Sequence, residues 1–196
     1  MSRRLRRGFF GRDPLEVAPD LLGKVLVAGP RSGRIVEVEA YRGSDDPGSH
    51  GYRGITPRTE VMFGPPGHLY VYFSYGMHWC ANVVCESDGV CGAVLIRALE
   101  PLTGLDAMYA ARSKAKRDRD LCSGPAKLCQ ALGVDGDHDG LDLTLAQLGV
   151  EVRDDGHRVL AHASSVRIGL SPGKGEDLPW RFYVANDPNV SASPRN

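Results

Sequence analysis

The chain has 196 residues, of which 42% are hydrophobic and 24% charged, a composition typical of one ordinary globular domain. Basic and acidic residues number 24 each, so the net charge is zero, which excludes attraction of nucleic acid by overall charge and leaves only local basic clusters. No apolar run approaches the ~20 residues needed to span a bilayer, which excludes a transmembrane helix.

A basic segment, a helix and a hairpin are predicted first. Residues 1–12 hold five arginines and we expect them to form a flexible basic segment; no apolar core follows, so they do not resemble a signal peptide. Asp13 can cap a helix that Pro14 starts and Gly23 ends. Two strands that form a hairpin are predicted next, at residues 24–28 and 34–40.

The chain's 24 glycines and 13 prolines indicate short strands and long surface loops. A loop rich in Gly, Ser and Asp spans residues 41–57, and loops of this length are usually functional or disordered. A short helical turn should begin at Thr56. Further strands are expected at residues 69–75, 79–84, 93–98, 150–153, 165–169 and 181–185, with helices at 104–111 and, capped by Ser123, at 125–132. These elements predict a mixed α/β (α+β) fold, a single domain (residues 1–196) built on a curved antiparallel β-sheet with surrounding helices.

Two of these strands carry candidate site residues. In the strand at 69–75, Tyr70 and Tyr72 project to one face, whereas Val71 and Phe73 project to the other. The strand at 34–40 alternates strictly, places two glutamates (Glu37 and Glu39) on one face, and leads directly into Tyr41. Carboxylates beside aromatic rings suit a pocket that stacks a nucleobase and activates water against it. The alternation does not choose between the glutamates, and a solvated strand face with surface ion pairs is the alternative.

Several blocks together resemble the alkyladenine (3-methyladenine) DNA glycosylase family, over about residues 20–184. The blocks are Glu37-Val38-Glu39-Ala40-Tyr41, Thr56-Pro57-Arg58, residues 69–77, Asn82, Arg97-Ala98-Leu99-Glu100-Pro101-Leu102 and residues 122–132. The resemblance implies a monofunctional glycosylase of base excision repair, whose partner is double-stranded DNA containing damaged purines. Such an enzyme flips 3-methyladenine, 7-methylguanine, hypoxanthine or ethenoadenine out of the duplex and hydrolyses the N-glycosidic bond, leaving an abasic site.

The resemblance also assigns roles to residues. It implies that Glu39 is the general base and that Arg97 supports the catalytic water. The flipped base would be held by Tyr41, His50 and Tyr72, while the amide of Asn82 would clash with the exocyclic amino group of normal guanine. Tyr75, at a turn with Gly76, would fill the vacated stack. Further contacts to DNA would come from Thr56, Arg58, Met62 and Met77.

No cofactor and no metal are expected. The five cysteines form no C-x-x-C pair and are expected to be reduced and buried. Residues 135–140 match half of an EF-hand loop, but Ala146 stands where a bidentate glutamate is required.

Two alternative functions stay open: a catalytically inactive damaged-DNA-binding module, and a metal-dependent hydrolase using the acidic residues at 135–142 with His138. We expect a monomer, cytoplasmic and nucleoid-associated if bacterial, or nuclear if eukaryotic, with no membrane partner.

Overall fold

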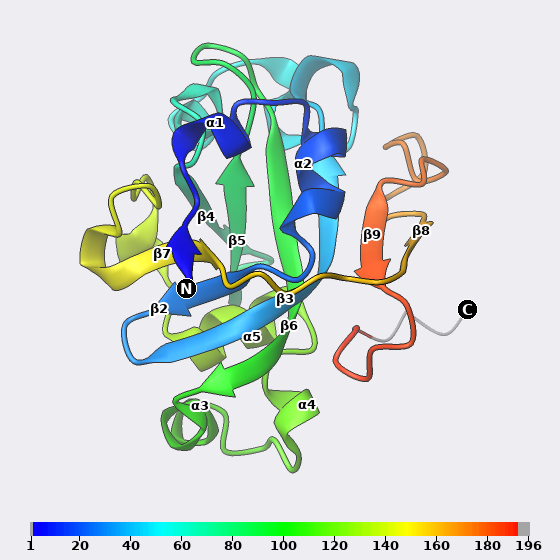
Figure 1. The fold of residues 1–196 in the computed structure, drawn as a ribbon. Helices are drawn as coiled ribbons and strands as arrows, with labels where there is room; N and C mark the ends of the chain where they lie inside the picture. Colours follow the sequence, from blue (N-terminus) through cyan, green and yellow to red (C-terminus); the bar gives the residue numbers. More distant parts are fainter. Residues whose placement is uncertain (1, 192–196) are drawn as a thin grey trace.

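The computed structural model describes residues 2–191 and shows one β-sheet flanked by helices (Figure 1). In this part of the chain the sheet has nine antiparallel strands in the order β1-β7-β2-β3-β6-β5-β4, with β9 paired to β3 and β8 to β9. The strands are β1 (Arg3–Arg4), β2 (Val25–Ala28), β3 (Arg31–Tyr41), β4 (Leu69–Ser74), β5 (His78–Val84), β6 (Ala93–Thr103), β7 (Val150–Asp154), β8 (His162–Ser165) and β9 (Arg181–Val184). The helices are α1 (Arg7–Phe10), α2 (Pro14–Leu21), α3 (Leu105–Ala111), α4 (Asp118–Leu121) and α5 (Pro125–Leu132). The predicted fold class is confirmed.

Strand β3 crosses the middle of the sheet and carries both candidate glutamates. β6 pairs along one edge of β3, while β2 and then β9 share the other edge. The register of β3 against β6 shifts on both sides of Glu37, which is an irregularity that bends a strand. Strands cover both edges of β3, and the side chains of Glu37 and Glu39 have no exposed surface. The alternative of a solvated strand face is therefore wrong.

The helices pack on the sheet through apolar side chains. Asp13 caps α2 as predicted, since its carboxylate accepts a hydrogen bond from the Leu15 N–H at 2.8 Å. α2 packs on β3 and β6, whereas α5 packs on β5 and β6. The largest fully buried side chains include Phe10, Leu21, Ile35, Ile96, Leu99 and Leu128. None of the described helices is long and apolar enough to cross a membrane.

The start of the chain is ordered against the sheet. β1 pairs with β7, and Leu5 and Phe10 are buried. The neighbouring arginines form ion pairs within the chain: Arg4 with Glu151, Arg7 with Asp142 and Arg12 with Asp20. The prediction of a flexible basic segment over residues 1–12 is therefore wrong for residues 2–12, because apolar burial and carboxylate partners hold this segment in place.

Two local predictions need correction. The strand expected at 165–169 is β8, which ends at Ser165, because its pairing with β9 stops at Arg181 and the chain then turns toward β3. Helix α5 is not capped by Ser123: Gly124 takes the N-cap position with φ 147°, which favours glycine. The loop predicted at 41–57 contains two short 3₁₀ turns, at Gly43–Asp45 and His50–Arg53.

Candidate active site

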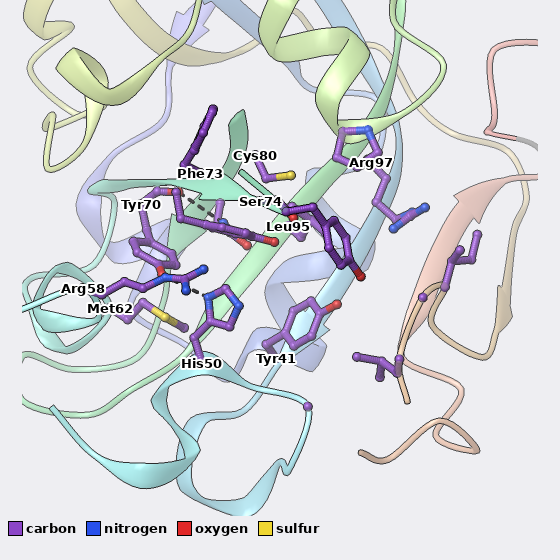
Figure 2. A pocket seen from close by; sticks show the side chains of 18 of the residues that line it. Tyr41, His50, Arg58, Met62, Tyr70, Phe73, Ser74, Cys80, Leu95 and Arg97 are labelled. Atoms are coloured by element: carbon purple, nitrogen blue, oxygen red, sulfur yellow. Dashed lines mark hydrogen bonds between the residues drawn. The ribbon is translucent and has the colours of Figure 1, made fainter. Parts of the chain in front are cut away.

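A cavity of about 560 Å³ opens beside the end of β3, within the size range of small-molecule sites. Its walls come from the loop after β3, the β4–β5 hairpin, β6, the start of α5 and the loop before β9 (Figure 2). It is lined by Tyr41, Gly48, His50, Arg58, Met62, Tyr70, Tyr72, Phe73, Ser74, Tyr75, Gly76, Cys80, Asn82, Leu95, Arg97, Pro125, Ile168, Gly169 and Leu170.

Aromatic rings form much of this lining. Tyr70 and Tyr72 stack with ring centroids 5.5 Å apart, so the predicted shared face of β4 is confirmed. His50 meets Tyr72 edge-on at 4.5 Å, and its Nδ1 lies 3.0 Å from the Tyr70 hydroxyl. Figure 2 shows Tyr41 on the His50 side of the cavity. The cavity thus offers flat, electron-rich faces to a planar ring.

His50 is neutral at physiological pH and therefore does not repel a positively charged ligand. Partial burial and the nearby Arg58 guanidinium lower the pKa of His50 to about 4, so the imidazole is neutral at physiological pH. Burial likewise raises the pKa of Tyr41 and of Tyr72, and both phenols keep their protons. The aromatic groups on this side of the cavity are therefore neutral, and the positive charge beside them belongs to Arg58.

Glu39 lies one layer behind the cavity wall. Its Oε1 accepts from the Ile168 N–H at 2.7 Å and lies 3.2 Å from Nη1 of Arg97. Its Oε2 accepts from the Tyr41 hydroxyl at 2.9 Å. All three donor residues line the cavity, whereas Glu39 does not. Three donors match an ionised carboxylate, which only accepts hydrogen bonds.

Glu37 has a different environment, although it is equally buried. Its Oε1 accepts from Arg97 Nε at 2.9 Å and from Arg181 Nε at 2.7 Å. Ser191 donates to it twice, through its hydroxyl at 2.8 Å and its N–H at 2.6 Å. Glu37 therefore ties β3 to β6, β9 and the end of the described chain. None of its partners except Arg97 lines the cavity.

Arg97 and Asn82 reach the cavity from neighbouring strands. Arg97 bridges the two glutamates and is not paired with Glu100, whose carboxylate lies near Arg34 instead. The Nδ2 of Asn82 donates to the Tyr70 carbonyl at 3.1 Å, which fixes the orientation of the amide. Both side chains lie where they can contact a bound ring.

The β4–β5 hairpin projects its tip into solvent. Tyr75 (φ 51°) and Gly76 (φ 65°) occupy the central positions of a turn closed by the Met77 N–H donating to the Ser74 carbonyl at 3.1 Å. Tyr75 is 84% exposed and Met77 67% exposed. The predicted turn is confirmed, and an exposed tyrosine stands at the rim of the cavity.

The remaining candidates are divided between surface and wall. Thr56 lies in a turn, where its N–H donates to the Thr59 hydroxyl at 2.9 Å. Arg58 lines the cavity with its guanidinium 5.4 Å from the Tyr72 ring centroid. Met62 is 2% exposed and lines the cavity, so it lies in the pocket wall, and its contact with DNA stays a prediction.

Sequence reasoning missed several lining residues because they come from distant segments. Cys80, Leu95 and Pro125 line the cavity from β5, β6 and α5, and Ile168 supplies a backbone donor to Glu39. No spacing signal connects residue 168 with residue 39. Only the return of the chain through β8 and β9 brings them together.

The acidic residues at 135–142 are used for structure. Asp135 pairs with His138, Asp139 accepts from the Val71 N–H, and Asp142 binds Arg7. Among residues 2–191, no group of three or more His, Cys, Asp or Glu side chains could hold a metal ion. All five cysteines are free and buried.

The cavity defines a class of protein: an enzyme whose pocket has aromatic side chains suited to a planar ring, next to a buried carboxylate–arginine pair able to assist hydrolysis. The chain matches the family model described as methylpurine-DNA glycosylase (MPG) over residues 8–188. The protein belongs to this family.

Similar proteins come from several bacteria, and each is named "Putative 3-methyladenine DNA glycosylase". One from Burkholderia cenocepacia is 57% identical over 95% of this chain and 90% of its own length. Others from Nitrobacter winogradskyi and Streptomyces avermitilis are 50% and 49% identical, over 93% and 95% of this chain and 84% and 90% of their own lengths. The protein is thus a DNA-repair hydrolase of the N-glycosidic bond of alkylated purines, with damaged DNA as substrate.

Proposed function

We propose that this glycosylase is monofunctional, flips a single damaged purine out of the duplex, and hydrolyses its glycosidic bond with Glu39 as general base. The observation that carries the proposal is the placement of stacked aromatic rings and a buried Glu39–Arg97 pair at one open cavity. A base inside a duplex is out of reach of such a cavity, so it must leave the stack first.

The proposed chemistry follows from the environment of Glu39. A cationic purine leaves with the electron pair of the glycosidic bond as a neutral base, and a neutral purine takes up a proton from solvent as it leaves. Positive charge develops on the sugar, and the buried carboxylate stabilises it. A water at the edge of the cavity attacks the anomeric carbon and gives its proton to Glu39. Arg97, held by both glutamates, orients that water.

The proposed substrates are 3-methyladenine, 7-methylguanine, hypoxanthine and ethenoadenine. The first two are cationic in DNA, and the neutral His50 and the tyrosine faces favour them by cation–π attraction. Asn82, fixed by its bond to the Tyr70 carbonyl, would clash with the exocyclic amino group of normal guanine. 7-Methylguanine keeps this group, and its positive charge would have to offset the clash. Tyr41, His50 and Tyr72 would hold the base, with Tyr75 inserted in its place in the duplex.

The direct test is excision from duplexes that each carry one of these four bases. We expect abasic product with the DNA strand intact until alkali is added, because no lysine is among the described residues that line the cavity and a Schiff base needs an amine. Strand cleavage without alkali, or a covalent complex trapped by borohydride, would contradict the monofunctional assignment.

Exhaustive treatment with EDTA is expected to leave the excision rate unchanged. The proposed water activation depends on a carboxylate, and the acidic residues at 135–142 already bind protein donors. The measurement is single-turnover excision before and after dialysis against chelator. Loss of activity that zinc or calcium restores would support a metal-dependent hydrolase instead.

Tyr75→Ala is expected to weaken binding and excision most for well-stacked, paired lesions. An extruded base leaves a gap whose unstacking costs a few kcal/mol, and an inserted side chain restores part of it. The measurement places one lesion opposite matched and mismatched partners. The deficit should shrink opposite a mismatch, where less stacking is lost.

Tyr72→Ala serves as the matched control, because Tyr72 lies inside the cavity on the same hairpin. Its deficit should depend on the charge and shape of the lesion and little on pairing. If Tyr75→Ala loses binding and excision by the same factor opposite every partner base, Tyr75 does not fill the vacated stack. Met77 would then be the next candidate for this role.

A further inference from the structure

A second buried ion pair, between Asp46 and Arg167, lies behind the cavity, and the proposed mechanism does not use it. Arg167 donates through Nη1 and Nη2 to the two carboxylate oxygens of Asp46, and neither side chain has exposed surface. Neither residue lines the cavity. A buried pair of this kind is often no more stabilising than apolar residues of the same volume, so stability alone does not account for it.

The guanidinium of Arg167 covers the back of Tyr41. Its central carbon lies 4.6 Å from the ring centroid of Tyr41 and 5.0 Å from that of Trp180. Nη1 also donates to the Ala40 carbonyl at 3.0 Å. Since Tyr41 lines the cavity and Arg167 does not, the cation supports the ring from the side away from the cavity.

The same pair joins two walls of the site. Asp46 accepts from the Gly48 N–H at 2.9 Å, in the loop that leads to His50. Arg167 precedes Ile168, whose N–H donates to Glu39 at 2.7 Å. The ion pair therefore sets the position of a stacking ring and, through the next residue, of the carboxylate that we propose as base.

Charge behind a stacking ring affects what can stack in front of it. A guanidinium on one face of a phenol repels a second cation on the opposite face and weakens the cation–π attraction there. The carboxylate of Asp46 neutralises the positive charge of the Arg167 guanidinium and so reduces this repulsion. A neutral base is nearly indifferent to either group, because it has no net charge to interact with them.

We propose that Asp46 and Arg167 set the preference of the cavity between cationic and neutral purines: Arg167 positions Tyr41 from behind, and Asp46 neutralises the charge that a cationic base would otherwise meet through the ring. The proposal rests on the proposed function, in which the flipped base stacks on Tyr41. Asp46 is a specificity-determining residue and Arg167 a positioning residue.

The test compares single-turnover excision of 7-methylguanine, which is cationic, with that of hypoxanthine, which is neutral, in the same duplex sequence. Asp46→Asn leaves Arg167 uncompensated and should lower the ratio of the two rates by roughly tenfold or more. Arg167→Gln leaves the carboxylate uncompensated and should raise the ratio. The double variant should bring it back toward the wild-type value, even where both rates are lower.

Asp155→Asn is the matched control, because Asp155 also binds an arginine (Arg34) through both oxygens but lies outside the cavity lining. Its ratio of the 7-methylguanine rate to the hypoxanthine rate should equal that of wild type.

If Asp46→Asn fails to fold, the opposite shift of this ratio in Arg167→Gln still tests the proposal. Equal loss on both bases in the folded single variants would overturn the inference and leave the pair a purely structural one. A wild-type protein that excises neither base would instead overturn the proposed function.

Discussion

Glu39→Gln is expected to slow excision by orders of magnitude while lesion binding stays close to wild type. The amide cannot accept a proton from water, and general-base contributions are typically 10²–10⁴-fold, so single-turnover rates should fall by roughly that factor. The side chain keeps its shape, and its remaining oxygen can still accept from Ile168 and Arg97. The measurement is single-turnover excision of hypoxanthine together with equilibrium binding to the same duplex.

Glu37→Gln is the natural control, since it is the same chemical change two residues along the same strand. Glu37 has no contact with the cavity except through Arg97, so its excision rate, measured below its melting temperature, should fall far less. Equal losses at both positions would mean that the general base has been wrongly assigned.

The same Glu37→Gln variant should, however, be the more unstable of the two. Glu37 receives hydrogen bonds from Arg97, Arg181 and Ser191, and removing one partner of a buried ion pair costs about 3–5 kcal/mol. At about 2–4 °C per kcal/mol for a chain of this size, the melting temperature should fall by roughly 6–20 °C. Calorimetry or thermal circular dichroism measures it.

Glu100→Gln provides the control for stability. Its carboxylate lies 3.5 Å from Arg34 and its side chain is 44% exposed, so the change should cost under about 1 kcal/mol. A melting temperature for Glu37→Gln within a few degrees of this control would show that the network around Glu37 carries little stability.

The local elements of the site could be predicted from the sequence. Alternation placed Tyr70 and Tyr72 on one face of β4, and the Tyr75-Gly76 pair marked the hairpin turn, because both features depend on neighbouring residues alone. The Asp13 cap of α2 followed for the same reason. The motif blocks were sufficient to indicate the family to which the chain belongs.

What distinguishes Glu37 from Glu39 was decided by tertiary structure. Both face the same way on β3, and both contact Arg97. They differ because Arg181 and Ser191, about 150 residues further along the chain, close over Glu37, whereas Ile168 and the cavity-lining Tyr41 bind Glu39. No local pattern encodes which distant donor reaches which carboxylate.

Which charged side chains become buried or paired also depends on segments that are distant in the sequence. Residues 2–12 read as a flexible basic segment, yet β7 pairs with their backbone and carboxylates from later segments pair with their arginines. The Asp46–Arg167 pair likewise joins loops that are far apart in the chain. Sequence by itself determined which segments form strands, turns and caps, since those depend on local sterics and hydrogen bonding. The fold decided which charges are buried together, because desolvation and pairing depend on what packs around them.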